Sequence, residues 1–414
     1  MTDTVQPRPY LMKNKIRDYA WGTRDEKAFI PRFVNEPVEP GKPYAELWMG
    51  AHPGAPSELL IDGKAVKLDQ LVQNDPEHIL GPDVYRRFGS SFPFLFKVLS
   101  IAEPLSIQAH PTREQAAVLF QQDPGHYPDS NHKPEIAIAL DYLTALVGLR
   151  SDAEILRLMH THPEIVEFTG KEFVADWQNG LSSSIEKTRH IRSLVIHMLQ
   201  QSDENPDQLA AVLDQLQQRL QIKKTNLGER ETWFLNLRKT YDSADIGLLF
   251  IFLLNLVHLK KGQGIFLSAG IPHAYLAGTL VECMANSDNV VRVGLTPKFK
   301  DVRALAGIID CRPGTPEIMS ENATERFRYA VPVDDFQVEK MKLGSQNIST
   351  GNRPEIILVT AGEITVAWNG SSGVQSESCS RGQSLFIPAC LSDYSLKGNP
   401  HAELFRASTP PVKA

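Results

Sequence analysis

The amino-acid sequence predicts a mainly β fold with α-helices, in which a helical domain interrupts the β-rich parts. Residues 1–150 are rich in Pro and Gly and contain short apolar runs such as 93–101, a pattern typical of strands and tight loops. In residues 151–260 Gly and Pro become scarce and Leu, Gln, Glu and Arg dominate, which indicates helices. Residues 261–414 return to short apolar runs, so we expect strands there again.

An internal repeat indicates that the β-rich parts contain two copies of one unit. Residues 262–269 resemble residues 382–389, a spacing of 120 residues. The first copy leads to Pro272 and His273, whereas the position that matches His273 in the second copy is Asp393. We therefore expect two copies that share a scaffold and differ in chemistry.

Strands separated by Gly-containing turns, with a Pro-His pair at a strand start, are typical of a cupin, a small double-sheet jelly roll. The predicted fold is thus a set of cupin-like jelly-roll barrels with an inserted helical domain. We expect an N-terminal cupin-like catalytic domain in residues 1–150, completed by residues 261–320. Residues 151–260 would form the helical insertion, and residues 321–414 a C-terminal cupin-like domain.

Three segments of the expected insertion have clear signals. Ser151 and Asp152 suit the N-cap of a helix, whose apolar pattern begins with Ile155, Leu156, Leu158 and Met159. Residues 246–257 form the longest apolar run and are expected to be a core helix, since a membrane helix needs about 20 apolar residues. Pro206 is suited to start a further helix, which would bury the residues at helical spacing Leu209, Val212, Leu213, Leu216 and Leu220.

Composition excludes several classes of function. The chain has 43 Lys and Arg against 49 Asp and Glu, a net charge of −6, which disfavours nucleic-acid binding because phosphate contacts need clustered basic residues. The four cysteines contain no Cys-x-x-Cys pair and are expected to be free, mostly buried thiols of a reducing compartment. Residues 1–13 contain no apolar run, so no secretory signal is expected. We expect a cytoplasmic monomer that binds neither nucleic acid nor membranes.

Three short strands carry polar side chains on one face, because side chains alternate along a strand. In residues 105–111 the polar face would hold Ser106, Gln108 and His110. In residues 131–140 Glu135 faces away from the apolar isoleucines, with only alanines behind it, which leaves room for a ligand. In residues 271–275 His273 shares a face with Tyr275.

Gln108, His110, Glu135 and His273 together offer two imidazoles, a carboxylate and an amide oxygen. This set suits Zn²⁺ or another divalent first-row ion. Many metal-binding cupins have a His where Gln108 stands, and the neutral amide favours a metal that acts as a Lewis acid rather than a redox centre. Taken singly, each residue has an ordinary interpretation: a hydrogen-bonded His in a strand, or a surface Glu after Lys133-Pro134.

Longer motifs in the same order resemble the type I phosphomannose isomerase family along nearly the whole chain. They include Lys133-Pro134-Glu135 and a Val-Arg-x-Gly-Leu-Thr motif around Arg292. The matching stretches are residues 19–22, 44–53, 93–99, 105–111, 132–135, 272–275, 282–289 and 291–298.

The resemblance implies a zinc enzyme that interconverts mannose 6-phosphate and fructose 6-phosphate. It implies one Zn²⁺ per chain, bound by Gln108, His110, Glu135 and His273, and a catalytic role for Arg292. The substrate would be a small sugar phosphate. The family pattern has an acidic residue where this chain has Thr279, and we expect this departure to affect at most a loop near the site.

Isomerisation requires groups that open the sugar ring and move hydrogen between C1 and C2. Lys133 and Glu282 are candidates for the hydrogen transfer, His132 and His52 for ring opening, and Asp288 as a further acid or base. The expected substrate contacts are Ser106, Tyr275, Lys97, Lys298, Trp21 and Glu46.

Arg292 would hold the phosphate or the enediolate oxygen, because a guanidinium suits either anion. The alternative for Arg292 is a buried ion pair with Asp288 or Glu282. For Lys97 and Lys298 the alternative is a solvated surface charge, and for Trp21 it is ordinary core packing.

Two other functions are compatible with a metal-binding cupin. A cupin oxygenase would need a redox metal and would consume oxygen, which the amide of Gln108 disfavours. A non-catalytic sugar-binding cupin would not require Lys133, Glu282 and Arg292 beside the metal ligands. Formation of ketose from mannose 6-phosphate would distinguish the isomerase from both.

Overall fold

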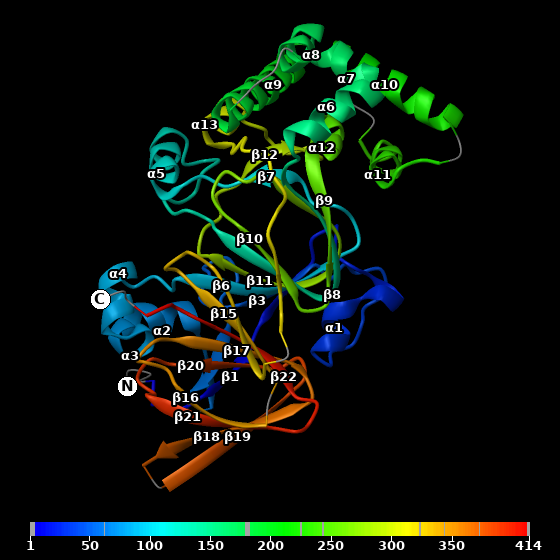
Figure 1. Cartoon of the computed structure of the whole chain (residues 1–414). Helices are drawn as coiled ribbons and strands as arrows, with labels where there is room; N and C mark the ends of the chain where they lie inside the picture. Colours follow the sequence, from blue (N-terminus) through cyan, green and yellow to red (C-terminus); the bar gives the residue numbers. More distant parts are fainter. Residues whose placement is uncertain are drawn as a thin grey trace.

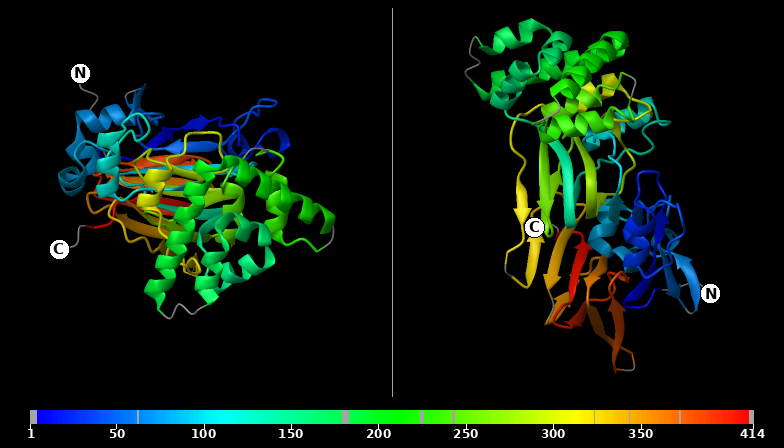
Figure 2. Two further views of the ribbon diagram at one scale, coloured as in Figure 1. Left: turned by 90° about the horizontal axis from the view of Figure 1, so that it is seen from above. Right: turned by 90° about the vertical axis from the view of Figure 1, so that its right-hand side faces the viewer.

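The computed structural model describes residues 5–61, 63–178, 183–223, 226–241, 244–322, 324–342, 344–371 and 373–411. The molecule is elongated, with the helices of the middle of the chain at one end and the C-terminal strands at the other (Figure 1; Figure 2). Strands account for 34% and helices for 31% of the chain, and the sheets are mostly antiparallel, so the fold combines a β frame with a large helical part.

The first sheet has ten strands. These are β2 (Lys15–Arg17), β3 (Glu46–Met49), β6 (Phe94–Ile101), β7 (Ile107–Ala109), β8 (Glu135–Leu149), β9 (Leu254–Lys260), β10 (Gln263–Leu267), β11 (His273–Ala285), β12 (Val291–Gly294) and β13 (Ile318–Ser320). Its path runs β13-β10-β8-β11-β6-β3-β2, with β9 on β8, and with β7 between the start of β11 and β12. The three strands predicted to carry the polar residues are therefore neighbours in one sheet.

The second sheet has eight strands and joins the two ends of the chain. These are β1 (Tyr10–Lys13), β4 (Glu58–Ile61), β5 (Lys64–Lys67), β14 (Arg326–Tyr329), β15 (Gln337–Lys342), β17 (Glu355–Ala361), β20 (Ser384–Ile387) and β22 (Glu403–Ser408). Tyr10 of β1 lies in register with Phe386 of β20. Three N-terminal strands thus extend the C-terminal sheet, because backbone pairing and not chain order decides sheet membership.

A third sheet of four strands lies at the end of the molecule opposite the helices (Figure 1). It consists of β16 (Ser345–Ser349), β18 (Glu363–Gly370), β19 (Gly373–Ser380) and β21 (Asp393–Gly398). Within the described residues the hydrogen-bonded sheets stay open, so the expected jelly-roll frames do not close into barrels.

The two copies of the internal repeat have the same strand register. Leu267 of β10 pairs with Glu135, and Ile387 of β20 pairs with Glu355. Both copies open on a glycine with positive φ, 81° at Gly262 and 87° at Gly382, a conformation that favours glycine. Glu355 therefore takes the position of Glu135 in the second copy.

In the second copy a buried ion pair stands where the first copy has Glu282 and Lys97. The acidic and the basic residue have exchanged strands. Glu282 of β11 lies in register with Lys97 of β6, and Arg406 of β22 lies in register with Glu339 of β15. The Arg406 guanidinium pairs with Glu339 at 2.7 Å and also with Glu355, which neutralises the counterpart of Glu135. The copies thus agree in scaffold and differ in chemistry.

The helices lie in two groups. Around the sheets lie a 3-10 turn (Asp25–Lys27), α1 (Phe29–Phe33), α2 (Leu68–Asn74), α3 (Pro76–Leu80), α4 (Pro82–Phe88) and α5 (Arg113–Gln122), whereas α13 (Val302–Ile308) lies between β12 and the helical end. The helical end of the molecule contains α6 (Asp152–Thr161), α7 (Pro163–Thr169), α8 (Lys171–Gln178), α9 (Ser184–Glu204), α10 (Pro206–Lys223), α11 (Glu229–Leu237) and α12 (Gly247–Leu253).

Two helix signals of the sequence are confirmed and one is wrong. Ser151 precedes α6, and its amide and hydroxyl both donate to Glu154. The five residues predicted to be buried on α10 are buried. The core helix expected over residues 246–257 ends at Leu253, and β9 begins at Leu254. The side-chain amide of Asn255 donates to backbone carbonyls, including Val147 at 3.1 Å and Gly314 at 2.8 Å, which holds this segment extended along β8.

The alternation of side chains along β8 separates two cores. Ile136 and Ile138 pack into the core between the first two sheets, together with Phe386. Ala137 and Ala139 face the inner side of the first sheet, in a second core that contains Tyr275. Because Glu135 begins the same strand face as the alanines, its carboxylate lies at the edge of that inner core.

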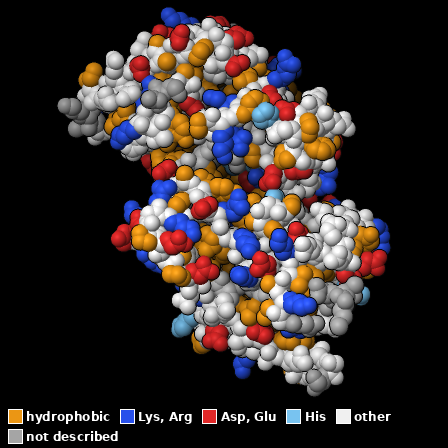
Figure 3. Space-filling view, turned by 180° about the vertical axis from the view of Figure 1, so that it is seen from behind, with side chains coloured by type: hydrophobic (Ala, Val, Ile, Leu, Met, Phe, Trp, Pro, Cys, Tyr) orange, Lys and Arg blue, Asp and Glu red, His pale blue; other side chains and the backbone are white. Residues whose placement is uncertain are grey.

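Three further sequence expectations bear on the class of protein. All four cysteines are free thiols, and Cys283, Cys311 and Cys379 are buried, as expected. Among the described residues no helix is long and apolar enough to span a bilayer. On the face shown in Figure 3, acidic and basic side chains are interspersed rather than gathered by sign.

Candidate metal centre

Three strand ends bring His110, Glu135 and His273 together. His110 follows β7, Glu135 begins β8 and His273 begins β11. One ligand atom of each residue lies within 4.8 Å of the others. Glu135 Oε1 is 3.3 Å from His110 Nε2 and 2.7 Å from His273 Nε2, and all three side chains are buried.

The three facing atoms lack the hydrogen bonds that buried polar atoms normally make. His110 Nε2, Glu135 Oε1 and His273 Nε2 have no hydrogen-bond partner in the described part of the chain. The other ring nitrogens are occupied: His110 Nδ1 lies 2.8 Å from the carbonyl of Asn289, and His273 Nδ1 lies 2.9 Å from that of Ile271. Donation from both Nδ1 atoms leaves the Nε2 lone pairs directed at the carboxylate, which is the arrangement of a metal-binding site.

The protonation states also suit a cation. Burial and the positive charge of Lys133 lower the pKa of His110 to about 4. Burial opposes ionisation of Glu135, but the two imidazoles outweigh it and hold the pKa of this carboxyl well below its usual value. A neutral imidazole at His110 and an ionised carboxylate at Glu135 are the forms that bind Zn²⁺, so these residues fit this ion.

Gln108 is half-buried on β7 and lies between two other predicted site residues. Its backbone pairs with His273 on one side and with Arg292 on the other. This position agrees with a fourth ligand from the amide oxygen, which remains a prediction.

Lys97 lies between two carboxylates near the centre. Its Nζ is 3.1 Å from Glu282 and 3.6 Å from Glu46, and all three side chains are buried. Burial lowers the pKa of Lys97, but the two carboxylates outweigh it and raise the pKa above its ordinary value. Burial also raises the pKa of Glu282. Because two carboxylates already neutralise the charge of Lys97, this residue is less suited to bind phosphate than the sequence suggested.

His52 and Asp288 form a second pair of predicted catalytic residues. His52 Nε2 lies 3.2 Å from Asp288 Oδ2, and the buried imidazole packs edge-on against Trp48. The hydrogen bond from His52 lowers the pKa of Asp288. The Asp288 side chain is 54% exposed, so this pair can meet a ligand that enters from solvent.

Two cations of the predicted site are without an ion-pair partner in the described residues. Arg292 lies on β12, half-buried, and the alternative pair with Asp288 or Glu282 is not formed, since those carboxylates bind His52 and Lys97. Lys133 is only 9% exposed. A cation held out of water without a partner is unfavourable, so both are suited to an anionic ligand.

Of the remaining predicted contacts, Ser106 is half-buried and Tyr275 is buried beside His273, with ring centroids 6.0 Å apart. The Tyr275 hydroxyl has no hydrogen-bond partner among the described residues. Trp21 packs against the inner core of the first sheet, together with Leu105.

The structure does not bring His132 or Lys298 into this group. His132 Nε2 contacts Asp335 at 2.9 Å and Arg113 at 2.7 Å, so its ring is engaged away from the metal ligands. Its neighbour Lys133, by contrast, is buried. Lys298 is exposed. Thr279 lies at a bulge of β11 opposite Ser100, and not in a loop as expected.

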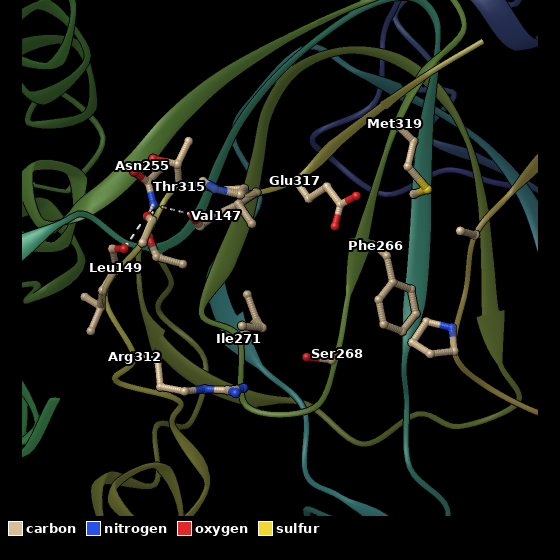
Figure 4. Close-up of a pocket in the computed structure, with 15 residues that line it drawn as sticks. Val147, Leu149, Asn255, Phe266, Ser268, Ile271, Arg312, Thr315, Glu317 and Met319 are labelled. Atoms are coloured by element: carbon tan, nitrogen blue, oxygen red, sulfur yellow. Dashed lines mark hydrogen bonds between the residues drawn. The ribbon is translucent and has the colours of Figure 1, made fainter. Parts of the chain in front are cut away.

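A cavity of about 330 Å³ lies next to His273, which contacts its lining residue Ile271. Val147, Asn255, Ser268, Ile271 and Glu317 line it between β8, β9, β10 and the segment that follows Arg312 (Figure 4). None of the predicted site residues borders it.

Sequence reasoning missed the residues that support the centre. Asp129 accepts hydrogen bonds from the Asn131 amide and from Ser287, and Asn289 supplies the carbonyl bound by His110. Asp245 accepts from the amide of Leu295, just after the Arg292 strand. These residues lie in loops, where no strand or helix periodicity marks them.

Comparison with known proteins agrees with the geometry. Residues 10–152 match the family model described as phosphomannose isomerase type I, catalytic domain. The chain is 36% identical to mannose-6-phosphate isomerase of Ogataea parapolymorpha over 392 residues, 88% of this chain and 90% of that one. It is 35% identical to the Rattus norvegicus enzyme of that name, over 93% of this chain and 94% of that one.

Solved structures show the same fold. A mutant of phosphomannose isomerase from Salmonella typhimurium superposes with a TM-score of 0.83 at 29% identity, covering 97% of this chain and 99% of that one. A zinc-bound mannose 6-phosphate isomerase superposes with a TM-score of 0.82 at 29% identity, covering 97% of this chain and all of that one. This chain belongs to the type I phosphomannose isomerase family.

Proposed function

We propose that this protein catalyses the reversible aldose–ketose isomerisation of mannose 6-phosphate and fructose 6-phosphate, with one Zn²⁺ bound by Gln108, His110, Glu135 and His273. The single observation that carries the proposal is the meeting of three buried ligand atoms that have no hydrogen-bond partner among the described residues. When bound, the zinc ion would polarise the sugar oxygens at C1 and C2 and stabilise negative charge there.

The acid–base work is assigned to residues around the three ligands. Glu282, whose pKa is raised by burial, is suited to exchange a proton with C1 and C2 of the sugar. Lys133 is the alternative for this transfer. Asp288 and His52 form a hydrogen-bonded pair that is suited to move the ring-opening proton.

Anion binding is assigned to Arg292 and Lys133, because neither has an ion-pair partner in the described chain. The guanidinium of Arg292 suits the phosphate or the enediolate oxygen. Trp21, Tyr275, Ser106 and Glu46 would contact the sugar. Lys97 would act by holding Glu46 and Glu282 in place rather than by binding phosphate.

The experiment that tests this function is an isomerase assay in deuterated water. The protein is incubated with mannose 6-phosphate before chelation, after chelation and after zinc is added back. Ketose formation that stops on chelation and returns with zinc supports the proposal. Binding of the sugar phosphate without ketose, or consumption of oxygen, would replace it by the sugar-binding or the oxygenase alternative.

We also propose a cytoplasmic monomer whose catalytic part is built from residues 1–150 and 261–320. Four free thiols support a reducing compartment. All the proposed ligands come from one chain, so that the centre needs no second copy.

A further inference from the structure

Two loops without regular structure carry three of the predicted catalytic residues, His132, Lys133 and Asp288. Residues 128–134 lead into β8 and contain Lys133, and residues 286–290 lead into β12 and contain Asp288. Loop backbone needs side-chain partners to stay in one conformation, because it has no ladder of its own. The partner these two loops share is the carboxylate of Asp129.

One oxygen of Asp129 joins the loops. Oδ1 accepts from the Asn131 amide at 2.9 Å, from the Ser287 hydroxyl at 2.9 Å and from the Asn289 side-chain amide at 3.1 Å. Asn289 and Ser287 are buried, at 0% and 2% exposure, so these bonds are shielded from water. We call Asp129, Asn131, Ser287, Asp288 and Asn289 the Asp129 clasp.

The other oxygen binds the backbone beside the catalytic pair. Oδ2 accepts from the Asp288 amide at 2.9 Å, and the Asp288 carboxylate in turn accepts from His52. The Asn289 side chain also donates to the Asp129 carbonyl at 2.7 Å and to the Asn131 carbonyl at 2.9 Å. The main chain around residue 288 is therefore tied at several points to the segment that leads to Lys133 and Glu135.

The clasp reaches the metal ligands through the backbone of Asn289. Its carbonyl accepts from His110 Nδ1 at 2.8 Å, which sets both the tautomer and the direction of Nε2. On the other loop, Glu135 follows Asn131 by four residues and is the first residue of β8. The Asp129 carboxylate thus contributes to the placement of two ligands and one acid–base pair relative to one another.

We propose that Asp129 is a positioning residue of the active site, which sets the metal affinity through Asn289 and His110 and sets the acid–base pair through the Asp288 amide. The assignment rests on the proposed function for its catalytic half and on the chain's own geometry for its metal half. Removing a hydrogen-bonded support of a metal ligand typically weakens metal binding about 10- to 100-fold.

Two variants of the full-length protein separate the two halves. Asp129→Ala removes every side-chain contact, so we expect the zinc dissociation constant, measured by chelator competition, to rise about 10- to 100-fold. Asp129→Asn keeps the side-chain volume and one acceptor oxygen. It places the side-chain NH₂ group, a donor, opposite the backbone N–H of Asp288, which is also a donor. We expect it to lower kcat at least about tenfold, with KM changed much less and zinc affinity reduced less than in Asp129→Ala.

The matched control is Asp123→Asn, which alters another loop carboxylate, one that accepts from the backbone and contacts the ring of the neighbouring His126. We expect its zinc affinity and kcat to equal those of the unmodified protein. Melting of the zinc-free variants shows how far folding itself is affected. Zinc affinity and kcat unchanged in both Asp129 variants, with only a lower Tm, would overturn the proposal. If Asp129→Ala binds zinc less tightly but the unmodified protein does not isomerise the sugar, the proposed function is wrong. The role of Asp129 in zinc affinity would still hold.

Discussion

The ammonium of Lys97 lies 3.1 Å from Oε2 of Glu282, and both side chains are buried beside the metal ligands. Glu46 approaches the same ammonium at 3.6 Å. One cation therefore supports two carboxylates in a region shielded from water, where an unpaired charge is strongly unfavourable.

Lys97→Met is expected to destabilise the protein by about 3–5 kcal/mol, because it leaves Glu46 and Glu282 buried without their partner. Urea unfolding of the zinc-free protein measures this free energy. Lys298→Met alters an exposed lysine and should stay within about 0.5 kcal/mol of the unmodified protein. Equal unfolding midpoints for the two variants would show that the Lys97 pairs do not contribute to stability.

His110→Ala and His273→Ala are expected to lose bound metal and activity together, since each removes one of the three facing ligand atoms. Metal analysis of the purified variants, with an isomerase assay on the same samples, checks this. His132→Ala is the control, because that ring binds Asp335 and should leave the metal content unchanged. Full zinc occupancy in either ligand variant would remove that residue from the set.

Arg292→Ala is expected to keep zinc and fold but to lower kcat about 10²–10³-fold, as removal of a group that stabilises developing negative charge does. Arg292→Lys keeps the charge without the planar guanidinium and should recover part of the loss. Steady-state kinetics with parallel metal analysis measure both. Near-normal turnover of Arg292→Ala would exclude Arg292 from the mechanism.

Acid unfolding is expected to report the pair of His52 and Asp288. The folded-state pKa of Asp288 is lowered by the hydrogen bond from His52, so the pair contributes stability above the unfolded pKa of about 3.9. That contribution is lost as the pH falls through the lower folded-state value. His52→Phe should therefore move the acid-unfolding midpoint of the zinc-free protein to higher pH. In an Asp288→Asn background the same change should have no such effect, and an equal shift in both backgrounds would contradict the assignment.

Arg406→Met tests the second copy of the repeat. It leaves Glu339 and Glu355 buried without a cation, so we expect a loss of about 3–5 kcal/mol in unfolding free energy. Zinc content and kcat should be unchanged, because Arg406 lies in the other sheet. Loss of zinc in a variant that remains folded would show that the copies are coupled.

Much of the site could be predicted from local patterns. Alternation along short strands placed Gln108, His110, Glu135 and His273 as inward polar positions, and the structure brings the last three of these together. The repeat at Gly262 and Gly382 was likewise visible, because a positive-φ glycine and the strand that follows it are local features. Helix starts at Ser151 and Pro206 depend only on nearby residues, so they too could be read from the sequence.

Tertiary structure decided which predicted groups act together. His132 and Lys133 are adjacent in sequence, yet one binds Asp335 and the other lies inside, and no local signal separates them. Residues 246–257 read as one apolar helix, but pairing with β8 makes the last four residues part of a strand. Asp129 meets Ser287 across 158 residues of chain. Periodicity records only how each segment folds by itself, whereas these contacts depend on which distant backbone lies opposite, and packing of the whole chain sets that.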